Sequence, residues 1–180
     1  DRRVEALAAY DRALVLHPGQ TAALIGRAEV LLALGRMPEA LANADEAITA
    51  DPHVLNGHLW RARVLILLGM PDAALEATAV ARHIAPQDPE AHISHGFALA
   101  ASNRIEAALL SYDEALQLQP NHIEAQWHRA LALLVLGRFQ EGWLAYESRN
   151  LRRKTMAARK YPQPLWWGQH SLKDQRLYLY

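Results

Sequence analysis

The chain has 180 residues, of which 51% are hydrophobic and 21% charged, enough apolar material for the core of one domain or one short solenoid. Lys plus Arg and Asp plus Glu both number 19, so a net charge of zero excludes a global attraction to nucleic acid or an anionic membrane. No cysteine is present, which excludes a disulfide framework and thiolate metal sites.

Prolines and turn-forming residues return along the chain with a fixed period of 34 residues. The prolines of this series are Pro18, Pro52, Pro86 and Pro120. A second series holds Gly35, Gly69, Asn103 and Gly137. Gly and Asn are the residues that best tolerate the left-handed backbone conformation that ends a helix. The period therefore predicts repeated pairs of helices, each pair joined by a turn at Gly or Asn.

In chain order, the pattern predicts one helix over 2–17, hairpins over 20–50, 54–84 and 88–118, and a last hairpin over 122–154 with a longer, basic second helix. Two antiparallel helices about 8–10 Å apart need small side chains where their axes come closest. Three registers of the repeat supply them: Ala28, Ala62, Gly96 and Ala130; Ala6, Ala40, Ala74, Ala108 and Gly142; and Ala13, Ala47, Ala81 and Ala115. Leucines fill another register, at Leu31, Leu65, Leu99 and Leu133.

This pattern resembles the tetratricopeptide repeat (TPR) family, in which Ala, an aromatic residue and Ala follow one another along the second helix before a closing Pro. Two units fit fully, with Ala6, Tyr10, Ala13 and Pro18, and with Ala108, Tyr112, Ala115 and Pro120. The aromatic register departs from the family at Ala44 and Thr78. The resemblance covers roughly residues 1–150 and implies an all-α fold, a right-handed superhelical solenoid of helical hairpins with an irregular C-terminal tail.

We expect three parts along the chain: a half repeat with only its second helix over 1–18, four hairpins over 19–154, and a tail over 155–180. Residues 1–6 align with 35–40, so the chain opens at the turn within a unit. Because such a half hairpin exposes apolar surface, we expect either preceding repeats or self-association with another copy there.

Two C-terminal segments resemble the lead-in to a glycosyltransferase-like domain in bacterial TPR proteins. One is Glu141-Gly142-Trp143 with Tyr146, Glu147 and Arg149, and the other is 164–168 followed by 177–179. The resemblance implies that a catalytic domain would lie beyond Tyr180. The chain itself would then be no enzyme, and would present an acceptor polypeptide to that domain.

In the family, the first helices of the units build a concave face that holds a partner. Its fifth, sixth and ninth positions predict a groove of Ile25, Glu29, Leu59, Trp60, Arg63, Ile93, Phe97, Trp127, His128 and Leu131. The second positions hold Ala22, Asn56, Glu90 and Glu124. Aromatic and aliphatic anchors in a concavity favour binding of an extended or helical protein segment. Two alternatives are that these side chains form inter-repeat core, and that residues 161–167 fold back over the face.

A clamp for C-terminal carboxylates, which some family members carry at the fifth and ninth positions, is not expected, because only Arg63 fits it. His92 and His95 lie three residues apart on one predicted helix and are a possible metal pair. We favour surface or inter-repeat histidines, and expect no metal, cofactor or catalytic residue.

Scattered carboxylates are expected to solvate the convex face rather than to act as an acid/base pair: Asp45, Glu46, Asp113 and Glu114. The basic stretch 149–160 is interpreted as a solvated helix end, not a nucleic-acid or lipid site. Apolar runs such as 64–68 are too short to cross a bilayer. With no signal-like run at the start of the chain, we expect a cytoplasmic protein that binds a protein or peptide partner, without membrane or nucleic acid.

Overall fold

The computed structural model describes residues 2–146, and the statements that follow concern this part of the chain. It contains nine α-helices and no strand: α1 (Arg2–Leu16), α2 (Thr21–Ala33), α3 (Met37–Ala50), α4 (Leu55–Leu67), α5 (Pro71–Ile84), α6 (Pro89–Ala101), α7 (Ile105–Leu118), α8 (Ile123–Val135) and α9 (Phe139–Tyr146). The predicted tail, the basic stretch 149–160, the segments 164–168 and 177–179 and the fold-back of 161–167 lie outside the described residues.

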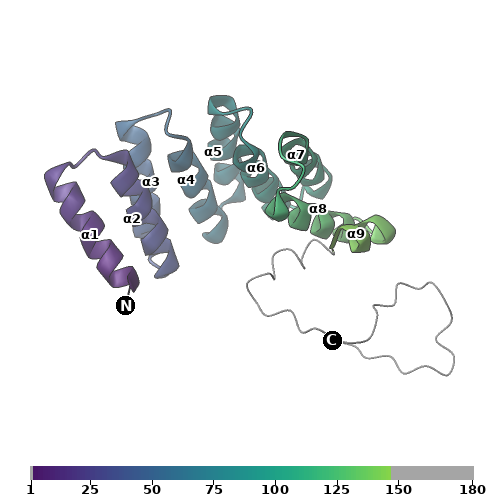
Figure 1. Cartoon of the computed structure of the whole chain (residues 1–180), viewed down its shortest axis with the longest axis horizontal. Helices are drawn as coiled ribbons and strands as arrows, with labels where there is room; N and C mark the ends of the chain where they lie inside the picture. Colours follow the sequence, from purple (N-terminus) through teal and green to yellow (C-terminus); the bar gives the residue numbers. More distant parts are fainter. Residues whose placement is uncertain (1, 147–180) are drawn as a thin grey trace, which may run out of the picture.

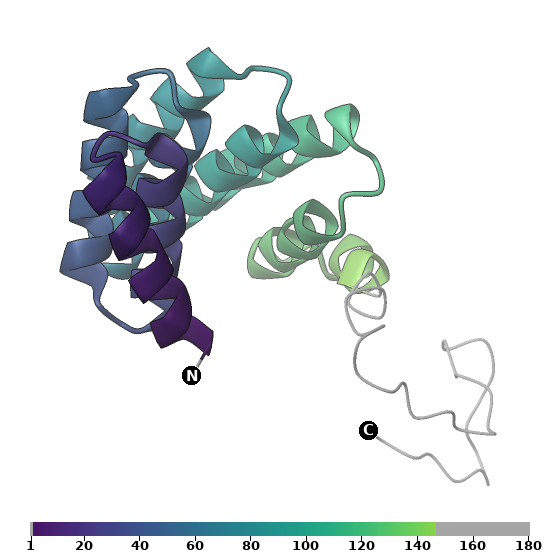
Figure 2. The ribbon, with the colours of Figure 1, turned by 60° about the vertical axis from the view of Figure 1, so that its left-hand side comes forward.

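The helices form a single curved row of antiparallel hairpins (Figure 1). We call α2, α4, α6 and α8 the A helices and α1, α3, α5, α7 and α9 the B helices. Each A helix contacts the next A helix as well as its two flanking B helices. Successive hairpins are rotated relative to one another, so the row bends into a superhelix (Figure 2). This arrangement confirms the predicted all-α solenoid, with the A helices on its inner side.

The turn inside each hairpin is built around one residue in the left-handed region. Its φ is 76° at Gly35, 73° at Gly69, 59° at Asn103 and 74° at Gly137. The N–H of the following residue donates back to a leucine carbonyl; for example, Met70 N donates to Leu65 O at 2.9 Å. The same bond forms at Leu31, Leu99 and Leu133. The predicted turn residues and the predicted leucines therefore belong to the same hydrogen-bonded helix end, which recurs at these four turns.

The connection between hairpins is held by the first turn of the next A helix. His58 Nε2 lies 2.9 Å from the carbonyl oxygen of Pro52, and His92 Nε2 lies 2.8 Å from that of Pro86. Gln126 donates to Pro120 O at 2.8 Å in the equivalent place. These bonds satisfy a backbone carbonyl of the loop that follows α3, α5 or α7 and fix that loop to the next A helix.

The small registers lie where the helices touch. Ala28, Ala40, Ala47 and their equivalents on α4 to α8 are almost completely buried, whereas Ala6 and Ala13 on α1 are half-buried. At Gly96 even a Cβ atom would lie 2.5 Å from the ring of Tyr112. The glycine therefore makes room for the aromatic residue, which is buried at 2% exposure.

Within the described part of the chain, no helix combines the length and apolarity needed to span a membrane.

Replacing Gly69 by Ala tests the hairpin turn. A side chain in the left-handed region costs about 1–2 kcal/mol, so Gly69→Ala should unfold at lower urea concentration than the wild type. Gly19→Ala is the matched control, since Gly19 has no left-handed φ and nothing lies within 4 Å of its added Cβ. Far-UV circular dichroism during a urea titration gives both midpoints. Equal midpoints for the two variants would show that the turn imposes no such constraint.

Candidate groove on the A helices

A cavity of about 540 Å³ opens on the inner side of the solenoid, between α4 and α6, with a contribution from the start of α8. Its lining consists of Asn56, Leu59, Trp60, Ala62, Arg63, Ile66, Leu67, Glu90, Ile93, Ser94, Phe97 and Glu124. It therefore contains five of the ten side chains predicted for the groove: Leu59, Trp60, Arg63, Ile93 and Phe97.

The apolar lining has a closed floor and an open edge. Ile93 is 1% exposed, so it forms the floor and belongs equally to the inter-repeat core. Leu67, by contrast, is 54% exposed at the end of α4. Leu59 and Phe97 are half-buried between these extremes. Apolar area that is both concave and partly exposed is what an apolar ligand side chain would cover.

Phe97 is held by an aromatic cluster behind the cavity. Its ring centroid lies 4.1 Å from that of His128 and 6.2 Å from that of Tyr112, both edge to face. Such pairs fix the ring at a defined angle. Burial raises the pKa of Tyr112 well above its ordinary value of 10, which keeps the phenol neutral. Phe97 thus reaches the groove from a rigid support.

Arg63 lies beside Trp60 in the wall of the cavity. Its guanidinium carbon is 5.2 Å from the centroid of the Trp60 ring, a cation–π contact. This contact orients both side chains along α4. Arg63 is also the one Lys or Arg among the residues that line the cavity.

The other five predicted groove residues do not line this cavity. Trp127 stacks on Tyr146 of α9, with centroids 4.8 Å apart, and His128 lies in the cluster around Phe97. The rest are Ile25, Glu29 and Leu131. Conversely, the predicted groove left out Ile66 and Leu67, which follow Arg63 on α4 and also line the cavity.

His92 and His95 both make contacts within the protein. His92 Nδ1 lies 3.0 Å from a Glu114 carboxylate oxygen, while its Nε2 faces Pro86. His95 Nδ1 lies 2.9 Å from the hydroxyl oxygen of Thr78, and the proton of that hydroxyl is directed at the carbonyls of Ala74 and Leu75 in α5. These contacts agree with inter-repeat histidines. Among residues 2–146, no group of three or more His, Asp or Glu is placed to hold a metal ion.

The carboxylates expected on the convex face take part in a further repeated contact. Arg27 pairs with Asp11 at 2.7 Å and Arg61 pairs with Asp45 at 2.8 Å. Arg129 and Asp113 form the same pair near the end of the described chain. In the unit between the Arg61 and Arg129 pairs, the positions of the Arg and the Asp are occupied by His95 and Ala79. The Arg–Asp pair is replaced there by the contact between His95 and Thr78. The 34-residue period carried this signal, which sequence reasoning missed.

Two family models described as tetratricopeptide repeat match the chain, one over residues 4–54 and 94–153 and the other over 32–94. A comparison with curated proteins returned no significant match.

Solved structures of similar fold include TTC0263, a thermophilic TPR protein of Thermus thermophilus. It is 25% identical, the match covers 87% of this chain and 85% of that one, and the TM-score is 0.77. MamA from Desulfovibrio magneticus RS-1 is 18% identical over 87% and 88% of the two chains, with a TM-score of 0.70. YrrB, described as a TPR protein with an unusual peptide-binding site, is 22% identical over 86% and 80%, with a TM-score of 0.63.

Acid should weaken the fold in part through His95. Burial, followed by the positive charge of Arg82, lowers the pKa of His95 below 6.5. The unfolded chain then binds a proton on His95 more readily than the folded chain does. The contribution of neutral His95 to the free energy of unfolding is therefore present above its ordinary pKa of 6.5 and is lost as the pH falls. Between about pH 7.5 and about pH 5.5, the thermal midpoint should therefore fall less in His95→Gln than in the wild type. Circular dichroism melts at both pH values measure this difference, and an equal fall would contradict it.

Proposed function

The chain belongs to the tetratricopeptide repeat family, whose members generally mediate protein–protein interactions, and we propose that it binds a protein or peptide segment in the groove between α4 and α6. The observation that carries the proposal is the apolar, partly exposed lining: Leu67 at the open edge, Phe97 on its aromatic support and Ile93 below them. A peptide-binding site in YrrB, a protein of the same fold, is consistent with such a role.

The groove suits apolar side chains spaced along one side of a segment. Its walls come from two parallel A helices, and its volume of about 540 Å³ accommodates several aliphatic or aromatic side chains. Anchors of this kind supply most of the binding free energy in peptide recognition. We therefore propose a ligand that places two or more apolar residues between α4 and α6.

Leu67→Asp should weaken peptide binding while preserving the fold. A carboxylate at the open edge of the groove would have to be desolvated by an apolar anchor, which we expect to weaken binding by about tenfold or more. The ligand source is a phage-displayed library of random peptides, selected on the wild type and then measured by fluorescence anisotropy. Leu110→Asp is the matched control, because Leu110 is 65% exposed on the B helix α7.

The two variants separate groove binding from non-specific adhesion. Peptides that bind the wild type and Leu110→Asp, but not Leu67→Asp, support the groove. Peptides that bind all three proteins equally, or a library that yields no binder, would overturn it. Circular dichroism shows in each case that the helices persist.

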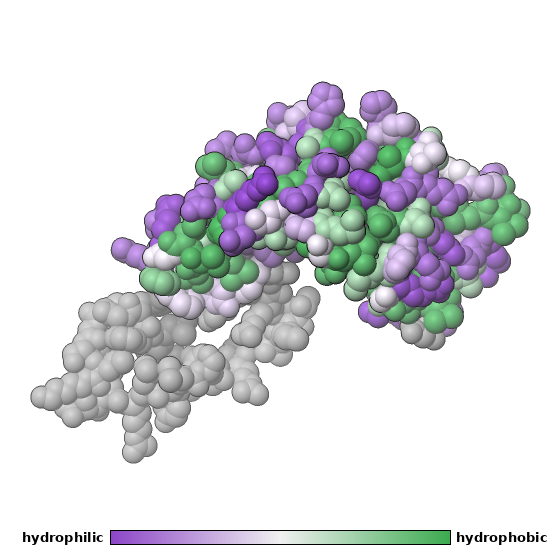
Figure 3. All heavy atoms as spheres, turned by 180° about the vertical axis from the view of Figure 1, so that it is seen from behind, coloured by the Kyte–Doolittle hydropathy of each residue, from purple (hydrophilic) through white to green (hydrophobic). Residues whose placement is uncertain are grey.

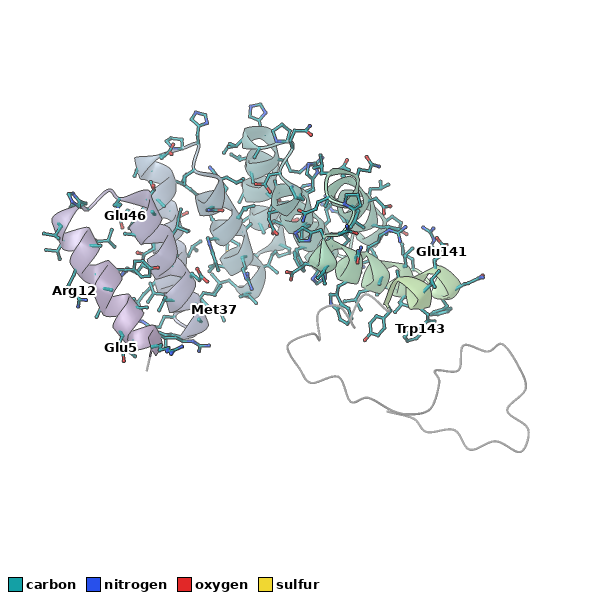
Figure 4. The ribbon with its side chains drawn as sticks, viewed as in Figure 1. Glu5, Arg12, Met37, Glu46, Glu141 and Trp143 are labelled. Carbon is teal, nitrogen blue, oxygen red and sulfur yellow. The ribbon has the colours of Figure 1, made fainter. Side chains whose placement is uncertain are left out.

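Self-association is a second candidate function, favoured by the surface of α1. This helix has no buried residue, and Val4, Val15 and Leu16 are all more than half exposed. At the other end of the described chain, Trp143 projects from α9 on the side away from Glu141 (Figure 4). Figure 3 shows hydrophobic patches near both ends. A role in presenting an acceptor to a glycosyltransferase domain stays a prediction from the sequence.

Leu16→Glu tests the association of copies through α1. Leu16 is 75% exposed, so a charge there should leave the fold intact but weaken any apolar contact by about tenfold. Static light scattering over a concentration series should show the wild-type mass rising and the variant mass rising less. Leu110→Glu is the control. A wild type that stays monomeric throughout would exclude this candidate.

A further inference from the structure

The groove carries an asymmetric distribution of charge that defines its partner further. Among its lining residues, Glu90 and Glu124 are acidic and Arg63 is basic. Both glutamates lie in the first turn of their helices, α6 and α8, and occupy the same position in successive units. Arg63 lies more than one turn along α4 and rests on Trp60. The carboxylates and the guanidinium therefore mark two different regions of one apolar cavity.

Each glutamate lies near a histidine: His122 at the N-cap of α8 contacts Glu90, and His128 lies one turn after Glu124 on α8 itself. Glu90 Oε1 lies 2.9 Å from Nε2 of His122, and Glu124 Oε1 lies 3.8 Å from Nε2 of His128. These imidazoles compensate the carboxylates only when they are protonated. Both glutamate side chains remain about half exposed, at 55% and 49%. The cavity thus offers accessible carboxylates at the edge of an apolar surface.

We propose that the partner segment carries a Lys or Arg beside its apolar anchors, and that this cation is held between Glu90 and Glu124. This inference rests on the proposed function of the groove. The apolar side chains of the ligand cover Leu59, Leu67 and Phe97, while its cation reaches the first turns of α6 and α8. A ligand carboxylate, where present, lies toward Arg63, so the charges fix the direction in which the segment runs.

Charge complementarity favours this partner over an acidic one. Among the described residues that line the cavity, Arg63 is the one Lys or Arg with which an acidic segment could pair, and such a segment would bring its carboxylates near Glu90 and Glu124. Like charges brought together at an interface disfavour the wrong partner, and opposite charges speed the encounter with the right one. The binding of the proposed partner should consequently weaken as salt is raised.

The experiment repeats the peptide selection with charge-reversed protein. Wild-type protein should enrich peptides with Lys or Arg next to apolar residues, and Glu90→Lys/Glu124→Lys should enrich acidic residues at those places. A selected peptide and its Lys→Glu counterpart, compared by anisotropy, should differ by about tenfold on the wild type and in the opposite sense on the double variant.

Two further proteins control for damage to the fold. Glu90→Gln/Glu124→Gln keeps the shape of both side chains and should lose the preference for basic peptides without reversing it. Glu46→Lys/Glu106→Lys changes the charge equally on exposed positions of the B helices and should keep the wild-type preference (Figure 4 shows Glu46).

The failure of this inference can be told apart from failure of the groove. Enriched peptides without basic residues that still depend on Leu67 would uphold groove binding and overturn the charge assignment. A preference for acidic peptides on the wild type would assign the ligand to Arg63 instead and overturn it as well. No enrichment at all would remove both proposals.

Discussion

The structure depends on the close approach of paired helices, which alanine and glycine permit. At the small registers a larger side chain would separate the two helix axes, since buried alanines such as Ala28, Ala47 and Ala130 leave no space around them. At Gly26 and Gly96 even a Cβ atom has no room, because the rings of Tyr10 and Tyr112 take its place. Close pairing requires a sharp turn in a fixed conformation, which explains why only Gly and Asn stand at the left-handed positions of the described chain.

The same constraint produces the inner surface. Because every hairpin turns alike and each A helix contacts the next, the rows of side chains on the A helices come to lie side by side. A groove between α4 and α6 is thus a consequence of repetition, whereas its chemistry depends on the residues that differ between units. Trp60 and Arg63 on α4 have no counterparts on α6, which contributes Ser94 and Phe97 at the same positions.

Periodicity was sufficient to predict the helices and the left-handed turns, and five of the ten residues that it proposes for a groove line the cavity between α4 and α6. It could not predict which of these side chains would be covered by contacts with a neighbouring unit. Trp127 shares its register with Leu59 and Ile93, but it stacks on Tyr146, a contact that depends on the partner side chain rather than on the period. The exposed Leu67 was reachable from the pattern through its position in the unit, whereas the burial of Ile93 follows from packing between units.

Several deviations from the repeat lie on or against α6, the helix that forms one wall of the groove. Its outer side makes no Arg–Asp pair, because His95 and Ala79 replace the two partners. Instead, His95 contacts Thr78 on α5 and His92 contacts Glu114 on α7, so α6 is tied to both neighbouring B helices by side-chain hydrogen bonds. These contacts fix the outer side of α6 against its neighbours. Its inner side contributes Glu90, Ile93 and Phe97 to the lining of the cavity. The departures from the common pattern therefore position the wall of the groove as well as set its chemistry.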